Sequence, residues 1–228
     1  AFDLKEPTFR HKMYADYKGT RKPMPEELRE QVPLMKEVLA AMGVPILTMA
    51  GYEADDILGT IAKRCQAEGE EVSVVSGDRD LLQLADIHIK IRIPKTSRGT
   101  TEIHDYYPED VKREYQVTPT EFIDVKALMG DTSDNIPGVP SIGEKTATNL
   151  IVAYGSIENA YAHLDEVKPP RAKKALEEHY DLAVMSKELA EICITCPITF
   201  EYEEAKIENL YTPEAYQYMK RLEFKSIL

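Results

Sequence analysis

Acidic residues gather in three short segments of the sequence. The segments are Gly51–Asp56, Gly77–Asp80 and Gly130–Asn135, and a further acid, Asp3, closes the opening Ala1-Phe2-Asp3. Two of the segments come directly after apolar, strand-like runs. Because the carboxyl ends of neighbouring strands meet at one edge of a sheet, these carboxylates can converge although they lie far apart in sequence. Converging carboxylates repel one another unless cations neutralise them, so the pattern predicts a hard-cation site for Mg²⁺ or Mn²⁺ with oxygen ligands.

The candidate metal ligands are the acids of these segments together with the acid of the opening stub: Asp3, Glu53, Asp55, Asp56, Asp78, Asp80, Asp131 and Asp134. Ordinary local roles compete with this interpretation, since acids are favoured in the first turn of a helix and Asp is a common turn residue. One acid per segment would satisfy those roles. Residues 53–56 hold three acids and residues 77–80 hold two, and this surplus favours a metal site.

A second chemical pattern follows the third acidic segment. Residues 138–147 read Gly-Val-Pro-Ser-Ile-Gly-Glu-Lys-Thr-Ala, with apolar residues between two glycines and a helix opening after the second. This spacing is typical of a helix–hairpin–helix, whose backbone N–H groups approach a phosphate at a helix N-terminus without reading the base. A plain helix–turn–helix connection is the alternative. The candidate DNA contacts are Gly138, Val139, Ser141, Ile142, Gly143, Lys145 and Thr146.

Residues 8–23 interleave cations with aromatic side chains. Cations attract phosphates, and aromatic faces stack on exposed bases. A solvated helix would carry the same cations, but its aromatic residues would follow one apolar stripe. The net charge of the whole chain is −12, yet local charge decides binding, so this acidity does not exclude a polyanionic partner. The candidate contacts of this segment are Arg10, Tyr17, Lys18, Arg21 and Lys22.

The composition is that of a globular protein with a sizeable core: 228 residues, 43% hydrophobic and 30% charged. No apolar run approaches the roughly 18 residues of a membrane span, so we expect no membrane partner. Three cysteines argue against a disulfide framework and fit a reducing compartment. Cys193 and Cys196 have the spacing of a zinc or redox motif, but no second Cys or His pair lies nearby, which favours two buried side chains.

Strand and helix signals alternate over residues 1–105, which predicts an α/β fold with a mostly parallel central sheet flanked by helices. Helices are expected at 26–42 and 53–67, and strands at 45–50, 71–76, 87–93 and 100–103, with a turn at 97–99. Residues 106–228 are expected to form a mainly helical region that contains the helix–hairpin–helix at about 128–153. Its helices are expected at 107–116, 119–130, 143–153, 156–163, 170–178, 180–192 and 212–222, while residues 197–208 give no clear signal.

In this order and spacing, the motifs resemble those of the 5′-nuclease (5′–3′ exonuclease) domain at the N-terminus of bacterial DNA polymerase I. The chain is also similar, more distantly, to phage 5′ nucleases and eukaryotic flap endonucleases. The similarity covers essentially the whole chain and rests on Phe2-Asp3, Tyr17-Lys18-Gly-Thr-Arg21, the three acidic segments and Gly138–Gly143. It implies a PIN-like α/β core followed by a helical region with an H3TH motif.

The resemblance also implies a function: hydrolysis of phosphodiester bonds in branched or nicked DNA with a 5′ single strand, during primer removal and repair. The candidate acids would hold two divalent cations. Residues 8–25 would form a helical arch, in which Lys18 and Arg21 act on the scissile phosphate and Tyr17 stacks on the DNA. The hairpin would grip the duplex irrespective of sequence, with K⁺ as a further ligand.

The family has another metal-binding Asp upstream of Asp3, and the sequence here begins after it. We therefore expect this chain to be an excerpt of a longer protein that continues into a polymerase region, and that is cytoplasmic, associated with the bacterial nucleoid and monomeric. A non-catalytic DNA-binding module is the first rival, since the upstream Asp is missing. A hydrolase of small phosphoesters is the second, but it leaves the hairpin unexplained.

Overall fold

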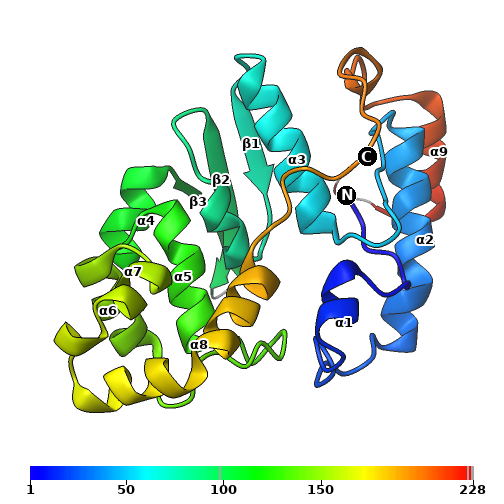
Figure 1. Cartoon of the computed structure of the whole chain (residues 1–228). Helices are drawn as coiled ribbons and strands as arrows, with labels where there is room; N and C mark the ends of the chain where they lie inside the picture. The colour runs from blue at the N-terminus through cyan, green and yellow to red at the C-terminus, as the bar shows by residue number, and fades with distance from the viewer. Residues whose placement is uncertain (98, 225, 227–228) are drawn as a thin grey trace.

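The computed structural model describes residues 1–97, 99–224 and 226. Its sheet has the strand order β1-β2-β3, formed by β1 (Val72–Val75), β2 (Ile89–Ser97) and β3 (Thr100–Tyr106). β1 and β2 run parallel, whereas β2 and β3 form an antiparallel hairpin whose connection includes residue 98, outside the described part (Figure 1). The expected α/β class is confirmed, although the sheet is small and mixed.

The side chains of β2 alternate between the two faces of the sheet. Ile89, Ile91 and Ile93 are buried, whereas Lys90 and Arg92 lie on the more accessible face. The 3₁₀ helix η1 (Arg79–Leu84) packs against β2 and α5 (Pro119–Met129), and α3 (Ala54–Ala67) packs against β1. One continuous hydrophobic cluster therefore runs from α3 through the sheet into the helical region.

The remaining helices after the sheet are α4 (Pro108–Tyr115), α6 (Glu144–Tyr154), α7 (Ile157–Ala162), η2 (Leu164–Glu166), α8 (Pro170–Ala190), η3 (Glu203–Ala205) and α9 (Pro213–Arg221). α5 packs against α6 and α8. α8 is kinked at His179, whose φ of −133° is not helical, and this kink corresponds to the expected break between two helices. Among the described residues, no helix is long and apolar enough to cross a membrane.

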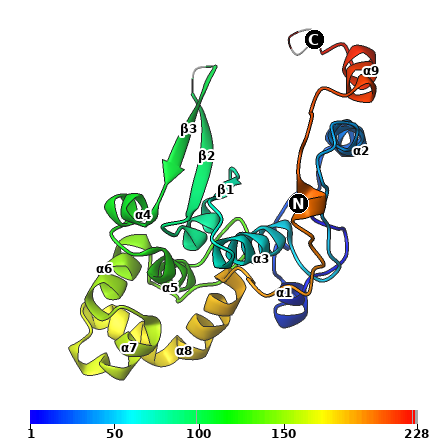
Figure 2. The same cartoon turned by 90° about the horizontal axis from the view of Figure 1, so that it is seen from above.

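α2 (Glu26–Ala41) stands apart from the sheet and pairs with α9, as Figures 1 and 2 show. The hydroxyl of Thr212, at the start of α9, donates to the carbonyl oxygen of Ala41 over 2.6 Å. Because α9 comes from the end of the chain, this contact ties the C-terminal region to the N-terminal one.

Two expected elements differ from the structure. Residues 45–50 do not form a strand, and the backbone hydrogen bond that links them to the chain start runs from Phe2 N–H to Leu47 O at 3.0 Å. One such bond does not make a ladder. In residues 8–25, the only helix is the five-residue α1 (Phe9–Met13), and residues 15–20 form turns, so the expected helical arch is wrong for this conformation.

The loop between α5 and α6 is closed by two glycines. Gly130 and Gly138 both have positive φ, and a Cβ on Gly138 would lie 2.4 Å from the nitrogen of Gly130. Asp131 and Ile136 exchange two backbone hydrogen bonds across the loop, at 2.9 and 2.8 Å. This close approach leaves no room for a side chain and holds the third acidic segment in a fixed turn.

We predict that Gly138→Ala lowers the free energy of unfolding by about 3 kcal/mol, because it combines left-handed strain with overpacking against Gly130. Gly155 is the matched control, since its φ is also positive but nothing would lie within 4 Å of a Cβ added there. Gly155→Ala should cost only about 1 kcal/mol. Urea unfolding of both variants measures the difference, and equal losses would contradict a close backbone approach at Gly138.

Candidate functional site

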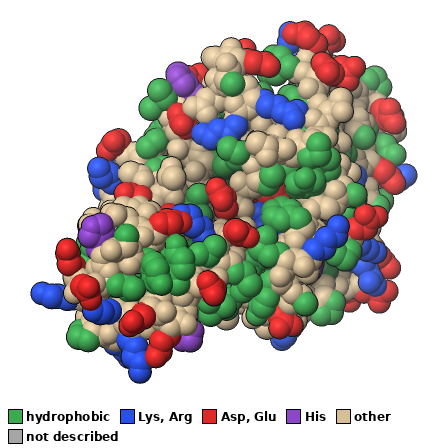
Figure 3. Space-filling view, viewed as in Figure 1, with side chains coloured by type: hydrophobic (Ala, Val, Ile, Leu, Met, Phe, Trp, Pro, Cys, Tyr) green, Lys and Arg blue, Asp and Glu red, His purple; other side chains and the backbone are tan. Residues whose placement is uncertain are grey.

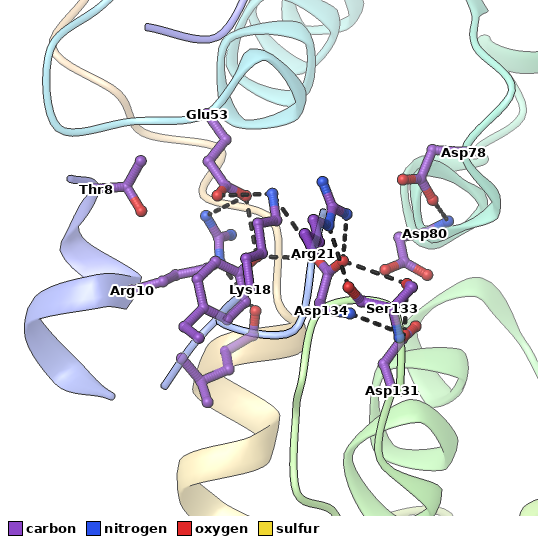
Figure 4. Close-up of polar contacts among 12 residues, drawn as sticks. Thr8, Arg10, Lys18, Arg21, Glu53, Asp78, Asp80, Asp131, Ser133 and Asp134 are labelled. Atoms are coloured by element: carbon purple, nitrogen blue, oxygen red, sulfur yellow. Dashed lines mark hydrogen bonds and ion pairs between the residues drawn. The ribbon is translucent and has the colours of Figure 1, made fainter. Parts of the chain in front are cut away.

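One pocket of about 260 Å³ brings the acidic segments and the basic segment together. Its lining includes the acids Asp3, Glu53, Asp55, Asp78, Asp80 and Asp134 and the cations Arg10, Lys18 and Arg21. Figure 4 shows acids and cations facing one another from separate elements, and Figure 3 shows acidic and basic side chains interspersed over the face of the molecule seen in Figure 1. Most of the predicted metal ligands thus share one pocket.

The acids of the α/β part lie at or next to the first residues of α3 and η1. Glu53 is the N-cap of α3, and Asp3 accepts a hydrogen bond from Ala54 N–H at 2.7 Å. Asp78 follows β1 after a short turn and accepts from Asp80 N–H at 2.9 Å, which caps η1. Glu53 and Asp78 therefore cap elements that pack against the core, and Asp3 is held against the start of α3.

The acid loop, defined here as Asp131–Ile136, carries the other candidate carboxylates. Asp131 accepts from both the backbone N–H and the hydroxyl of Ser133, at 2.7 and 2.6 Å, and from the ammonium of Lys126. Burial alone would raise the pKa of Asp131, but the hydrogen bonds from Lys126 and Ser133 outweigh it and lower the pKa to about 2. Asp131 is therefore ionised at any physiological pH.

The basic turn, defined here as Asp16–Arg21, is docked on the acid loop by backbone contacts. Lys18 N–H donates to Asp134 O at 2.7 Å, and the side-chain amide of Asn135 donates to Asp16 O at 2.6 Å. Lys18 has a positive φ of 55°, within the left-handed region of the backbone. Its ammonium lies 2.8 Å from Glu53 Oε1, and Arg21 forms an ion pair with Asp134.

Lys126 is a functional candidate that the sequence patterns did not single out. Its ammonium lies 2.9 Å from Asp80 Oδ1 and also pairs with Asp131, so one side chain bridges two acidic segments. Burial lowers the pKa of Lys126, but these two carboxylates outweigh that effect and raise it. The signal that could have found it is its place as a lone cation in the apolar run Phe122–Met129.

Asp55 shows the electrostatic cost of crowding. Burial raises its pKa, the negative charges of Asp78 and Asp3 raise it further, and the resulting pKa is about 7 instead of 3.8. Lys18 acts in the opposite direction. The pKa of Asp55 is thus raised chiefly by burial and additionally by the neighbouring carboxylates.

The donor chemistry of the pocket fits hard divalent cations. Its candidate ligands are carboxylate oxygens, which Mg²⁺ and Mn²⁺ prefer. Within the described residues, no three His, Cys, Asp or Glu side chains are close enough to hold one ion as they stand. Lys18 pairs with Glu53, Arg21 with Asp134, and Lys126 with Asp80 and Asp131, so side-chain cations offset part of the carboxylate charge in this structure.

Two predicted site residues form a buried structural pair. Arg10 and Asp56 are 3% and 0% exposed, and they are joined by two parallel hydrogen bonds of 2.8 Å. Arg10 also donates to the carbonyl oxygens of Leu189 and Glu191, and Asp56 accepts from Glu53 N–H as a helix cap. Since both side chains are fully engaged, the structure contradicts the predictions that Arg10 contacts DNA and that Asp56 binds metal.

Tyr17 also lies inside the protein. It is 3% exposed and packs with Ile136 and Leu189, while its hydroxyl lies 3.1 Å from Glu53 and 3.0 Å from Asp134. Burial raises the pKa of Tyr17, and the two carboxylates raise it further. This position contradicts stacking of the ring on DNA in this conformation. Lys22, by contrast, is exposed at the edge of the basic turn.

The hairpin presents fewer groups to solvent than expected. Val139 and Ile142 are buried in the main core, and the N–H groups of Gly138 and Val139 are taken by Ser186 Oγ and Leu128 O. The structure therefore contradicts direct DNA contact by these inward residues. The remaining candidates lie at the surface or are half-buried: Ser141, Gly143, Lys145 and Thr146.

Family comparisons agree with this fold and pocket. Residues 1–116 match the N-terminal resolvase-like domain of 5′–3′ exonucleases, and residues 117–212 match the C-terminal SAM fold of the same enzymes. The chain therefore belongs to the 5′–3′ exonuclease family. Its curated relatives include DNA polymerase I of Bacillus caldotenax, 45% identical, and of Bacillus subtilis, 43% identical. Both alignments cover 100% of this chain and 26% of the relative, so the chain spans about a quarter of their length.

Solved structures show the same fold. A bacteriophage T5 protein co-crystallised with metal ions is 26% identical, with a TM-score of 0.69 over 84% of this chain and 74% of its own. The flap endonuclease of bacteriophage T5, in a pseudo-enzyme-product complex with DNA and metal ions, has a TM-score of 0.69 at 22% identity, over 99% of this chain and 82% of its own.

We predict that Arg10→Met lowers the free energy of unfolding by about 3–5 kcal/mol, because it leaves the carboxylate of Asp56 buried without its partner. The loss should be the same with and without Mg²⁺. Arg29→Met is the control, since Arg29 pairs with Glu26 at the surface and should cost less than about 1 kcal/mol. Urea unfolding tests this, and an unchanged stability with weakened DNA binding would restore the DNA-contact role.

We predict that, in EDTA, stability falls as pH rises from about 4 to about 7. The pKa of Asp55 is about 7 in the folded protein, against an ordinary value of 3.8, so between these pH values the folded state binds a proton that the unfolded state has lost. Raising the pH removes this proton and therefore lowers the free energy of unfolding. Asp55→Asn should flatten this slope. Urea midpoints at several pH values measure it, and an equal slope in both proteins would contradict the raised pKa.

Proposed function

We propose that this chain is a structure-selective 5′ nuclease that hydrolyses DNA phosphodiester bonds, as a 5′–3′ exonuclease and 5′-flap endonuclease. The observation that carries the proposal is the pocket in which carboxylates and the cationic side chains of Lys18 and Arg21 meet from distant segments of the chain. The family membership and the DNA and metal ions in the T5 structures support it.

The chemistry would use two divalent cations, Mg²⁺ or Mn²⁺. Bound there, they would lower the pKa of a water molecule and stabilise the attacking and leaving oxygens of an in-line displacement. Asp3, Glu53, Asp55, Asp78, Asp80, Asp131 and Asp134 would hold them directly or through water. Asp56 is not in this set, because Arg10 occupies both of its oxygens.

Lys18 and Arg21 would change partners during the reaction. In this structure they neutralise Glu53 and Asp134. Once bound cations neutralise those acids, the ammonium and guanidinium groups are free to contact the scissile phosphate and to stabilise the charge that develops on it. Movement of the basic turn would also expose Tyr17, which now fills the space below it.

The remaining partners are proposed on the resemblance. The hairpin would hold duplex DNA irrespective of sequence through Ser141, Gly143, Lys145 and Thr146, with K⁺ as its ligand. The whole protein would act as a monomer in the bacterial cytoplasm, at the nucleoid, in primer removal and DNA repair.

We predict that Asp134→Asn in the full-length protein slows cleavage of a labelled 5′-flap duplex in Mg²⁺ by roughly 100-fold, about 2.7 kcal/mol of activation free energy. EDTA should abolish cleavage by the unchanged protein. Asp165→Asn is the control, because Asp165 is an exposed acid outside the pocket. If the Asp134→Asn variant cleaved at the unchanged rate, Asp134 would not be a metal ligand. If the unchanged full-length protein bound the flap duplex in Mg²⁺ but never cleaved it, the alternative of a non-catalytic DNA-binding module would be favoured.

A further inference from the structure

Two cysteines lie three positions apart in the segment that follows α8, and residues 193–196 are called the dithiol segment below. Cys193 is half-buried, whereas Cys196 is buried, and both thiols are free. The Sγ atom of Cys196 lies 3.9 Å from the carbonyl oxygen of Cys193, so the chain turns back on itself between them. The spacing favours two buried side chains, but the structure leaves Cys193 accessible to solvent.

Both ends of the dithiol segment are held by one face of α3. Cys193 N–H donates to Asp56 Oδ1 at 2.9 Å, and Cys196 N–H donates to Thr60 Oγ1 at 3.0 Å. The hydroxyl of Thr60 in turn donates to the carbonyl oxygen of Cys193, and the guanidinium of Arg64 donates to that of Cys196. Since these three side chains follow one another at intervals of four along α3, the helix fixes where the two cysteine backbones lie relative to each other.

The two thiols differ in their access to solvent and in their ionisation. Burial chiefly, and the neighbouring Cys193 thiol in addition, raise the pKa of the Cys196 thiol to about 11. Cys196 is therefore protonated and sheltered, while Cys193 can be reached by a small molecule. An accessible thiol beside a sheltered one is the arrangement in which a disulfide reagent reacts at the first thiol and is displaced by the second. Within the described residues, no third His, Cys, Asp or Glu joins the pair to hold a metal ion, which favours thiol oxidation over zinc binding.

We propose that Cys193 and Cys196 are a site of reversible oxidation, at which a low-molecular-weight disulfide converts the two thiols into one disulfide bond. The thiolate of Cys193 attacks a sulfur of the oxidant, forms a mixed disulfide and releases the first small thiol. Cys196 then loses its proton to solvent and attacks Cys193 Sγ, and the second small thiol leaves. The protein loses two hydrogens, the oxidant is reduced to two thiols, and excess thiol reverses both steps. The inference is independent of the proposed nuclease function.

The test equilibrates the full-length protein with mixtures of oxidised and reduced glutathione, quenches with acid, alkylates the free thiols and digests with trypsin. Both cysteines fall in the tryptic peptide 188–206, so their disulfide is detected by mass as the loss of two hydrogens from one peptide that takes up no alkyl group. Cys65 is the matched control, since it is also half-buried but is the only cysteine of its tryptic peptide, 65–79. Cys65 should remain a free thiol or carry one glutathione.

Because α3 holds the dithiol segment in place, the ratio of disulfide to dithiol at a given glutathione ratio should be about tenfold higher in the native protein than in urea. An equal or lower ratio in the native protein, or mixed disulfides alone on peptide 188–206, would overturn the proposal.

Two variants test the order of attack. Cys196→Ser should leave a persistent mixed disulfide at Cys193, whereas Cys193→Ser should leave Cys196 unmodified until urea exposes it. Equal modification of Cys196 in the folded Cys193→Ser protein would refute Cys193 as the first thiol to react.

Discussion

Repulsion among carboxylates is the constraint around which this structure is arranged. Acids from the chain start, α3, the turn after β1 and the acid loop face one pocket, where each negative charge raises the cost of the next. Side-chain cations offset that cost: Lys18 at Glu53, Arg21 at Asp134 and Lys126 between Asp80 and Asp131. In the metal-free protein, cationic side chains placed among the carboxylates therefore offset part of their repulsion and allow the fold to hold them together.

The same cations link the two halves of the proposed activity. A group that neutralises a carboxylate in this conformation is also a group that can bind a phosphate, so cation binding and substrate binding draw on one set of side chains. The acid loop adds a second link, because it supplies Asp131 and Asp134 and leads directly into the hairpin. A duplex bound at the hairpin, as proposed, would therefore be held by the segment that directly follows the acid loop.

Much of this arrangement follows from local sequence rules. Gly130 and Gly138 mark the closed loop, the helices are bounded by ordinary caps, and acids after β1 or at the start of α3 reach the same edge. The predictions from sequence fail where a side chain pairs with a residue far away in the chain. Nothing near Arg10 or Asp56 indicates that they pair with each other across 46 positions, and the partners of Lys126 lie on other elements. Residues 45–50 have a strand-like composition, but composition does not supply a neighbouring strand.

The buried pair of Arg10 and Asp56 has a consequence for how the protein folds. Arg10 is fixed by carbonyl oxygens at the end of α8, and its bond to Leu189 spans 179 positions. Tyr17 reaches Asp134 across 117 positions. Forming a contact between residues so far apart in sequence costs loop-closure entropy, so such a contact becomes favourable only after most of the intervening chain is ordered. A nascent chain that has all its candidate acids but lacks α8 would therefore not yet hold them in place, and the pocket would form in a late, cooperative step.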